Sequence, residues 1–385
     1  MTTRAPCAPR WPLRSSRAWP VCSPGSSART TARSWTRCNP DRHGGQRMQP
    51  MKEIHGITRE RFEREVVPAY EPVVLRGVVA HWPLVKQGEA GLEACLGYLS
   101  GFDAGRPVDA LLARPDPTRA FGYSPDQASF NFLRDQRPYA ALFEQLWRYS
   151  HFPDPPSLAA QSALVPEALP GLEAANPMPL LDAAIAPRLW VGNRATVPAH
   201  FDDSHNIACV AAGRRRFTLL PPACAPLLYL GPPDHAPTPA PMSVVPDLHT
   251  ADRGRYPLLA EALAQAAVAE LGPGDAVYIP PLWFHQVEAL APHLNLLMNY
   301  WWRPLAAPGR PDDLHLAALR LAMLALRHLP EAEREGWRAL FGHYVFGAQG
   351  AALDHIPPAQ RHLFGELDAA ADAAQRADLV KRLTR

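Results

Sequence analysis

Apolar and polar positions alternate over short segments in the second half of the chain. From residue 188 onward, runs of six to ten residues rich in Val, Leu, Ile and aromatic residues are separated by Gly, Pro or Asp. Several short strands at this spacing are typical of an all-β sandwich or jelly roll. The predicted strands lie at 188–193, 197–202, 206–212, 214–222, 275–281, 283–290 and 293–302.

The other segments give a different pattern. A short helix is predicted at 58–70, followed by a strand at 71–79. Residues 101–190 are rich in proline and predict loops with short helices such as 138–150. The Ala- and Leu-rich stretch 257–271 predicts a helix between strands. The expected organisation is a leader (1–50), an N-terminal extension (51–190), a β core (191–305) and C-terminal helices (306–385).

The C-terminal stretch LHLAALRLAMLALRHL is apolar almost all round its predicted helix. A helix without a polar face must be covered on several sides. Its own domain or a second copy of the chain could supply that cover, so a homodimer is one expectation.

Charge divides the chain unevenly. Residues 1–50 hold nine arginines, no lysine and one acid, Asp41, a net charge of +8 in a chain of overall charge +2. The remainder therefore carries −6, which disfavours nucleic acid as a partner. The leader is interpreted as disordered, as an organelle transit peptide, or as an over-extended N-terminus with translation starting at Met48 or Met51.

Two further patterns bear on location. There is no run of about 18 apolar residues, so no membrane span is expected. The six cysteines include no CxxC pair, which argues against a disulfide framework and favours the cytoplasm.

The stretch PAHFDDSHN (198–206) carries the first candidate chemistry. Side chains alternate along a strand, so His200 and Asp202 face one way while Asp203 faces the other. A third ligand is available at His285 in the segment GDAVYIPPLWFHQVEAL. Two histidines and one carboxylate form the metal site of non-haem iron enzymes, with positions left open, whereas a structural zinc site would need a fourth protein ligand. Asp203 and His205 are interpreted as a solvated turn or as partners that orient the ligands.

Arg215 is the second candidate. In GRRRFTLLPP it shares strand parity with Phe217 and Leu219, so it faces the core if they do. A buried guanidinium is costly unless an anion meets it, and a planar carboxylate suits it. The alternatives are an internal acidic partner or a register that turns Arg215 to solvent.

Four segments together resemble a known family. PAHFDDSHN, GRRRFTLLPP, GDAVYIPPLWFHQVE and MNYWW resemble the cupin-like branch of the Jumonji C oxygenases, which includes the asparaginyl hydroxylase that inhibits hypoxia-inducible factor. The resemblance covers residues 51–305. It implies a mainly β, double-stranded β-helix (cupin or jelly-roll) core with an N-terminal α/β decoration, and the C-terminal helices resemble dimerisation helices more loosely.

The resemblance also implies an activity, that of a hydroxylase using Fe(II), 2-oxoglutarate and O₂. The residues carried over as iron ligands are His200, Asp202 and His285. Those carried over to the co-substrate are Arg215, Asn206 and Asn299, with Thr196 added as a nearby candidate. No catalytic residue is expected beyond the metal site.

The chain departs from the family pattern at three positions. Arg215 stands where a lysine is common, Val197 stands where the asparaginyl hydroxylase has a threonine, and Ala159 stands where a tyrosine is expected. Thr196 is one place from Val197, on the opposite face. Trp301 and Trp302 are expected in the core.

Other functions remain open from the sequence. A metal-dependent cupin enzyme that does not use 2-oxoglutarate would keep the metal ligands, and a non-catalytic cupin-like module would bind without turnover. The prime substrate, a protein or a small molecule, is not identified by any motif.

Overall fold

The computed structural model describes residues 48–303, 314–347 and, with gaps at 358–359, 362, 364 and 366, residues 355–384. The leader predicted at 1–50 lies almost entirely outside the described residues. Among the described helices, none combines the length and the apolar character that a membrane crossing needs.

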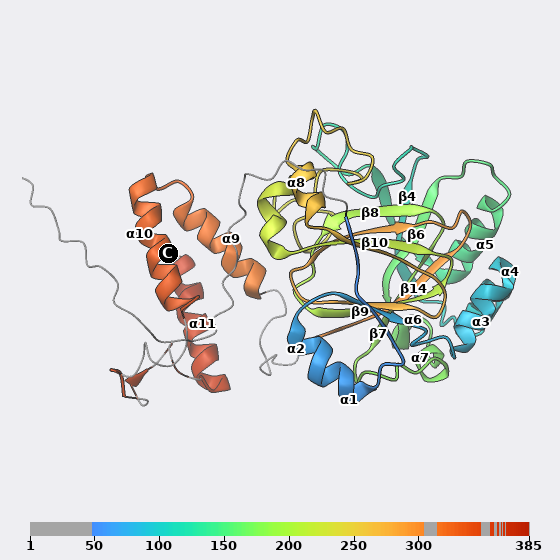
Figure 1. Cartoon of the computed structure of the whole chain (residues 1–385), viewed down its shortest axis with the longest axis horizontal. Coiled ribbons are helices and arrows are strands. Elements are labelled where there is room, and N and C mark those ends of the chain that lie inside the picture. The colour runs from blue at the N-terminus through green and yellow to red at the C-terminus, as the bar shows by residue number, and fades with distance from the viewer. Residues whose placement is uncertain are drawn as a thin grey trace, which may run out of the picture. The chain divides into compact units, whose positions relative to one another are not determined.

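Two β-sheets form the core, and Figure 1 shows β8 and β10 of the smaller sheet lying over β7, β9 and β14 of the larger one. Within the described residues the smaller sheet has the order β1 (Gln49–Pro50), β11 (Ala267–Leu271), β10 (Arg215–Leu220), β13 (Phe284–Ala289) and β8 (Ala195–His200). The larger sheet has the order β2 (Glu53–His55), β3 (Val73–Arg76), β12 (Ala276–Ile279), β9 (His205–Ala212), β14 (Asn295–Trp302), β7 (Pro187–Gly192), β6 (Ser157–Leu164), β4 (Pro107–Ala113) and β5 (Phe132–Pro138).

An apolar cluster fills the space between the sheets. Phe217 and Leu219 of β10 pack there with Val287 of β13 and with Val210 and Val277 of the larger sheet. The alternate residues of β10 and β13 face outward, toward a second cluster that includes Leu220 and Phe284. This alternation is the jelly-roll pattern, and it confirms the predicted fold class.

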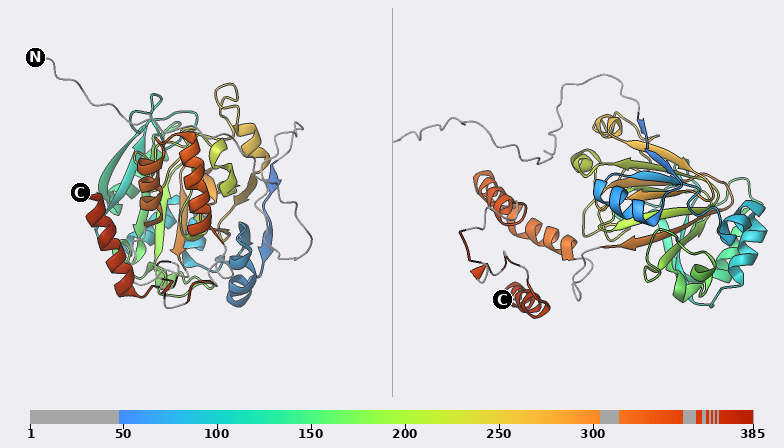
Figure 2. Two further views of the ribbon diagram at one scale, coloured as in Figure 1. Left: turned by 90° about the vertical axis from the view of Figure 1, so that its left-hand side faces the viewer. Right: turned by 60° about the horizontal axis from the view of Figure 1, so that its bottom comes forward.

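Helices cover the outer face of the larger sheet, and the right-hand view of Figure 2 shows α3–α5 packed there. Gly88 of α3 permits a close approach, because a Cβ at that position would lie 2.4 Å from the carbonyl oxygen of Ala211 in β9. The helical elements of the body are α1 (Arg59–Arg61), η1 (Phe62–Val66), α2 (Val67–Ala69), α3 (Pro83–Ala90), α4 (Leu92–Ser100), α5 (Tyr139–Tyr149), α6 (Val165–Ala168), α7 (Leu172–Ala175), η2 (Pro222–Leu227) and α8 (Leu259–Ala264). The C-terminal helices are α9 (Leu314–Leu326), α10 (Glu331–Tyr344) and α11 (Ala369–Leu383).

Two predictions about secondary structure are wrong. The region 101–190 is not mainly loops, because β4, β5 and β6 extend the larger sheet there. The helix predicted at 257–271 ends with α8, and Ala267–Leu271 forms β11 between β10 and β1. In both places pairing with a neighbouring strand outweighs local propensity, which is a weak determinant for alanine-rich segments.

Candidate metal centre and its surroundings

The structure brings His200, Asp202 and His285 together at one end of the smaller sheet. β8 ends at His200, β13 begins one residue before His285, and the two histidines are directly opposite in the antiparallel pairing. Their ring centroids are 4.3 Å apart, and Nε2 of His285 lies 3.6 Å from Oδ2 of Asp202. One ligand atom from each residue lies within 4.8 Å of the others, so the three can meet at one ion.

Hydrogen bonds fix the tautomers of both histidines. Nδ1 of His200 lies 2.9 Å from the carbonyl oxygen of Pro198, and Nδ1 of His285 lies 3.1 Å from that of Trp283. A carbonyl oxygen only accepts, so each Nδ1 carries the proton and each Nε2 offers its lone pair. Burial, with His285 close by, lowers the pKa of His200 to about 4, which keeps its ring neutral. The donor set therefore fits a divalent metal ion.

A chain of polar groups holds the carboxylate of Asp202. Its Oδ2 accepts from Nε1 of Trp301 at 3.2 Å and from Nδ2 of Asn206 at 3.5 Å. Asn299 donates to Oδ1 of Asn206 at 3.4 Å, and Trp190 donates to Oδ1 of Asn299 at 2.9 Å. Asn206 and Asn299 are both almost fully buried, so the expected pair of asparagines lies beside the metal ligands.

The turn before His285 is tied to the opposite ligand strand and to the N-terminal helices. The backbone N–H of Leu282 donates to the carbonyl oxygen of Asp202 at 2.7 Å. The hydroxyl of Tyr70 donates to the carbonyl of Pro281 at 3.1 Å, and the indole of Trp283 donates to the carbonyl of Tyr70 at 3.2 Å. Leu282 and Tyr70 have φ of 65° and 54°. Left-handed backbone at residues other than glycine is costly and persists only when the surroundings impose it.

Arg215 lies between the sheets, on the same face of the smaller sheet as His285. It shares strand parity with Leu219, which pairs directly with His285. The residue is 8% exposed, its Nε has no hydrogen-bond partner, and no described carboxylate forms an ion pair with it. Burial lowers the pKa of Arg215 to about 10, so the guanidinium remains charged at neutral pH. The site therefore has an unsatisfied cation that fits a carboxylate ligand.

Thr196 does not reach this face. It pairs with Glu288, whereas its neighbour Val197 pairs with Val287, which packs between the sheets. The side chain of Thr196 therefore points away from Arg215. Its backbone carbonyl accepts from the N–H of Phe121 at 2.9 Å, so its observed contact is with the loop that follows β4. The expectation that Thr196 binds a cofactor has no support in this geometry.

The remaining polar residues of PAHFDDSHN have structural partners. Asp203 forms an ion pair with Arg303. His205 is buried, lies 2.7 Å from the hydroxyl of Tyr278 through Nδ1, and stacks on Trp302 at a centroid distance of 5.3 Å. The solvated-turn interpretation is therefore wrong for His205, which helps anchor the start of β9.

Trp301 was expected in the core, but its indole N–H holds a metal ligand. It pairs with Asn206 across β9 and so faces the interior together with Asn299, two residues earlier. The same parity argument that singles out Asn206 would have found Trp301. Trp190 could not be found in this way, because its role depends on the pairing of β7 with β14.

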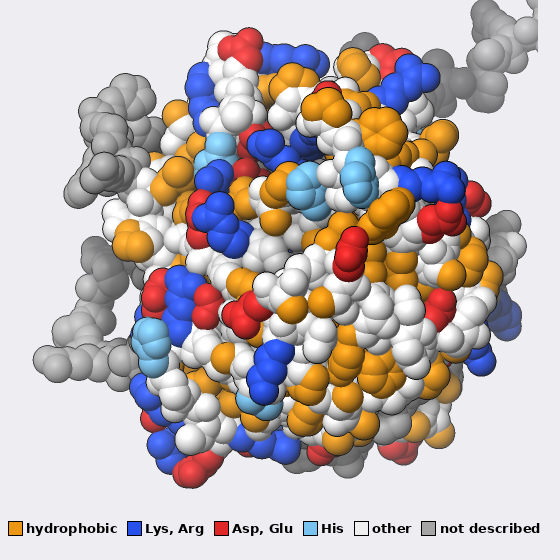
Figure 3. All heavy atoms as spheres, turned by 90° about the vertical axis from the view of Figure 1, so that its right-hand side faces the viewer, with side chains coloured by type: hydrophobic (Ala, Val, Ile, Leu, Met, Phe, Trp, Pro, Cys, Tyr) orange, Lys and Arg blue, Asp and Glu red, His pale blue; other side chains and the backbone are white. Residues whose placement is uncertain are grey.

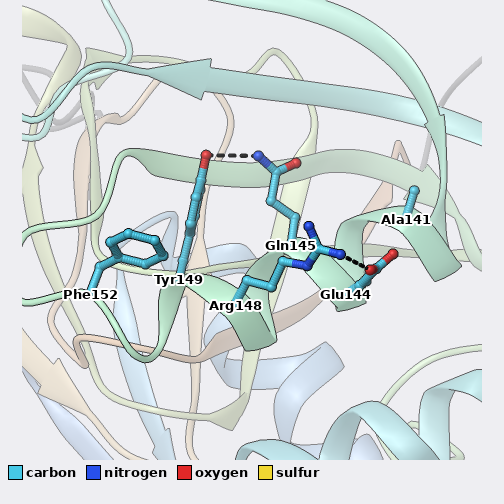
Figure 4. Close-up of a pocket in the computed structure, with 6 residues that line it drawn as sticks. All are labelled: Ala141, Glu144, Gln145, Arg148, Tyr149 and Phe152. Carbon is cyan, nitrogen blue, oxygen red and sulfur yellow. Dashed lines mark hydrogen bonds and ion pairs between the residues drawn. The ribbon is translucent and has the colours of Figure 1, made fainter.

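A hollow on the outer surface of α5 is not part of this centre. It is lined by residues of α5 and the segment after it, and Figure 4 shows that its polar side chains bind one another. Gln145 donates to the hydroxyl of Tyr149 at 2.7 Å, and Arg148 pairs with Glu144 at 2.5 Å. The described polar groups of the hollow are therefore already partnered.

A comparison with protein families agrees with the fold. A family model described as a cupin-like domain matches residues 59–307. The chain belongs to the cupin-like domain family. The matched residues include both sheets' central strands and all three metal-ligand candidates.

Three relatives of this cupin-like chain show the range of the family. It is 29% identical over 259 residues to lysine-specific demethylase JMJ31 of Arabidopsis thaliana, covering 62% of this chain and 40% of the relative. It is 26% identical over 327 residues to tRNA wybutosine-synthesizing protein 5 of Gallus gallus, covering 75% and 93%. It is 24% identical over 272 residues to the bifunctional peptidase and (3S)-lysyl hydroxylase JMJD7 of Homo sapiens, covering 63% and 80%. The chain thus spans less than half of the demethylase.

Replacing Trp301 by phenylalanine should weaken metal binding about ten-fold, because the outer partners of a metal ligand orient it and their loss commonly has this effect. The affinity of the metal-free protein for Mn(II) can be measured by calorimetry. Trp147→Phe is the matched control, since the indole of Trp147 also donates to a carboxylate, Glu93 at 3.2 Å, but on exposed α5. Equal affinities for the two variants would contradict the role given to Trp301.

Proposed function

We propose that this chain is an Fe(II)- and 2-oxoglutarate-dependent oxygenase that hydroxylates its substrate. The observation that carries the proposal is the pairing of a two-histidine, one-carboxylate centre with the unpartnered guanidinium of Arg215 on the same interior face. This donor set suits iron with coordination positions left open. The family membership and the name of the lysyl hydroxylase support the same chemistry.

Each residue of the site has a distinct task in this proposal. His200, Asp202 and His285 hold the iron through two Nε2 atoms and a carboxylate oxygen. Arg215 binds the distal carboxylate of 2-oxoglutarate, for which its planar fork is suited. Asn206 donates a hydrogen bond to Asp202, and Asn299 donates one to Asn206. The two asparagines therefore hold the carboxylate ligand in place beside the co-substrate. Bound iron would supply the redox chemistry in which O₂ is the oxidant, one of its oxygen atoms entering the succinate formed with CO₂ from 2-oxoglutarate and the other entering the hydroxylated product.

The surroundings of Arg215 strengthen its attraction for a carboxylate. Phe217, Leu219, Leu271 and Val287 are buried in the same cluster between the sheets. An apolar environment weakens dielectric screening and excludes water, so a guanidinium and a carboxylate attract each other more strongly there than at the surface. The departure from lysine to arginine at this position keeps the charge and adds a second parallel hydrogen bond.

The proposal predicts slow release of succinate when the purified protein is supplied with Fe(II), ascorbate, O₂ and 2-oxoglutarate, even without a prime substrate. His200→Ala should abolish this release, because the ion would lose one of its three protein ligands. Succinate is quantified by mass spectrometry. If iron binds and 2-oxoglutarate neither binds nor is consumed, the chain is a different cupin enzyme or a binding module.

Arg215→Met should raise the Kd of 2-oxoglutarate by more than about ten-fold, as expected for loss of a charge-assisted bidentate pair. The free energy of unfolding should stay equal or increase, because the variant removes a buried charge that has no described partner. Calorimetry with Mn(II) in place of iron measures the first quantity, and urea unfolding measures the second. Arg214→Gln is the control, since Arg214 is the preceding residue and is 67% exposed. Destabilisation with unchanged co-substrate binding would show that Arg215 has a structural role.

We further propose that the prime substrate is a protein. The relatives include a lysine-specific demethylase, a lysyl hydroxylase and a tRNA wybutosine-synthesizing protein. Family membership alone therefore does not decide the class of substrate. The net charge of −6 over residues 51–385 opposes a polyanion. Figure 3 agrees for the face it shows, where described basic and acidic side chains are interspersed.

A cytoplasmic location belongs to the same proposal. Cys95 and Cys209 are buried and carry free thiols. Free thiols are normal in a reducing compartment.

We also propose that two copies of the chain associate through α9. No described residue of α9 is buried, and Leu319 and Leu324 are 46% and 78% exposed. An apolar helix needs a cover, and a second copy supplies an identical apolar surface. Sedimentation of the full chain should give a dimer, and Leu324→Asp should shift it to a monomer. A monomeric wild-type chain would mean that its own core covers α9.

A further inference from the structure

A second arginine faces the interior of the larger sheet near the metal ligands. Arg188 of β7 pairs directly with Asn299 of β14, so the two side chains lie on the same face. Trp190, two residues later, shares this face and donates to Asn299. Arg188 is thus on the wall that carries the polar chain leading to Asp202.

The guanidinium of Arg188 is held in place by neutral groups. Its carbon Cζ lies 5.7 Å from the ring centre of Trp301. Its Nη1 donates to the carbonyl oxygen of Ser162 at 2.9 Å. Ser162 has a φ of 48° and lies where the pairing of β6 with β7 shifts register. An irregular, left-handed residue in a strand therefore presents its carbonyl to this cation.

Part of this guanidinium has no protein partner. No described carboxylate forms an ion pair with Arg188, and its Nε and Nη2 have no hydrogen bond within the described chain. Neither atom is both buried and without a partner, so Nε and Nη2 are accessible to solvent. In contrast, Arg303 near the same end of β14 is neutralised by Asp203. The Nε and Nη2 edge is the side of a guanidinium that binds a carboxylate through two parallel hydrogen bonds.

One indole separates this free edge from the metal centre. Trp301 carries Arg188 over its ring and donates through Nε1 to Asp202. An anion bound to Arg188 would therefore lie near the metal but not on it. Arg215 is a separate cation on the smaller sheet and is reserved for the co-substrate in the proposed function.

We propose that Arg188 binds a carboxylate of the prime substrate, and that the substrate is a peptide segment with an acidic residue near the oxidised position. This inference rests on the proposed oxygenase function. A carboxylate is favoured over a nucleic-acid phosphate because a polyanion needs several cations, and Arg188 stands among neutral groups while Arg303 is already paired. Arg188 would then set specificity, and Ser162 and Trp301 would position it.

A library experiment tests this inference. The full-length protein, with Fe(II), 2-oxoglutarate and O₂, is given a library of capped peptides in which the residues around each candidate position vary. Mass spectrometry then identifies peptides that gain one oxygen atom. The wild-type protein should enrich Asp or Glu at one flanking position by about ten-fold, the factor expected for a charge-assisted pair.

Charge reversal gives the decisive comparison. Arg188→Glu should shift the enrichment at that flanking position to Lys or Arg, and Arg188→Gln should abolish it. Arg194→Glu is the control, because it makes the same charge change on an exposed residue just past the other end of β7, and it should retain the acidic preference. The control excludes an effect of net charge alone.

The outcomes separate this inference from the proposed function. Absence of succinate release by the wild-type protein without peptide would overturn the oxygenase proposal itself. Succinate release together with peptide oxidation that shows no acidic preference would overturn only the role of Arg188. If an added tRNA pool is oxidised and no peptide is, the role of Arg188 is likewise overturned and the substrate is RNA. Because the wild-type selection is informative alone, the inference stays testable even if Arg188→Glu fails to fold.

Discussion

The antiparallel pairing of β8 with β13 is the constraint on which the rest of the site depends. It places His200 directly opposite His285 although 85 residues separate them in the chain. A shift of one residue would turn one ring out of the interior. The hydrogen bond from the N–H of Leu282 to the carbonyl of Asp202 joins the residue after β8 to the turn before β13. The metal centre is thus a consequence of strand register, and the left-handed backbone at Leu282 is a local cost of holding it.

Burial of uncompensated charge is the second organising feature. Arg215 is enclosed by apolar side chains without an acidic partner, which lowers the stability of the ligand-free fold. A buried, unpaired charge is tolerated when the rest of the core supplies enough folding stability. Here that stability comes from the apolar clusters between the two sheets and on their outer faces. The same apolar enclosure makes the guanidinium an effective carboxylate receptor. Stability and binding therefore make opposing demands on residue 215.

Strand alternation made much of the core predictable from the sequence. It placed Arg215 with Phe217 and Leu219 on one face, because a period of two needs no knowledge of partners. Asp202 instead lies in the connection between β8 and β9, so its position beside the histidines depends on that turn. Alternation could not reveal contacts that depend on which strands are neighbours. The bond of Trp190 to Asn299 arises only when β14 pairs with β7. Thr196 shares sequence parity with His200, but the register shift in the pairing of β8 with β13 turns it to the opposite face, which parity alone could not reveal.

The region that the sequence described least well builds one wall of the site. Residues 101–190 contribute β4, β5 and β6, which extend the larger sheet beyond β7. The register shift in β6 presents the carbonyl of Ser162 to Arg188, so the orientation of Arg188 depends on an irregularity that no hydrophobic pattern encodes. The pairing of β8 with β13 at the metal centre also shifts register, between His285 and Val287, yet both histidines stay directly opposite each other. Because the irregularity in β6 acts on Arg188, substrate selectivity in this chain should depend on that strand and should vary between relatives while the metal ligands stay fixed.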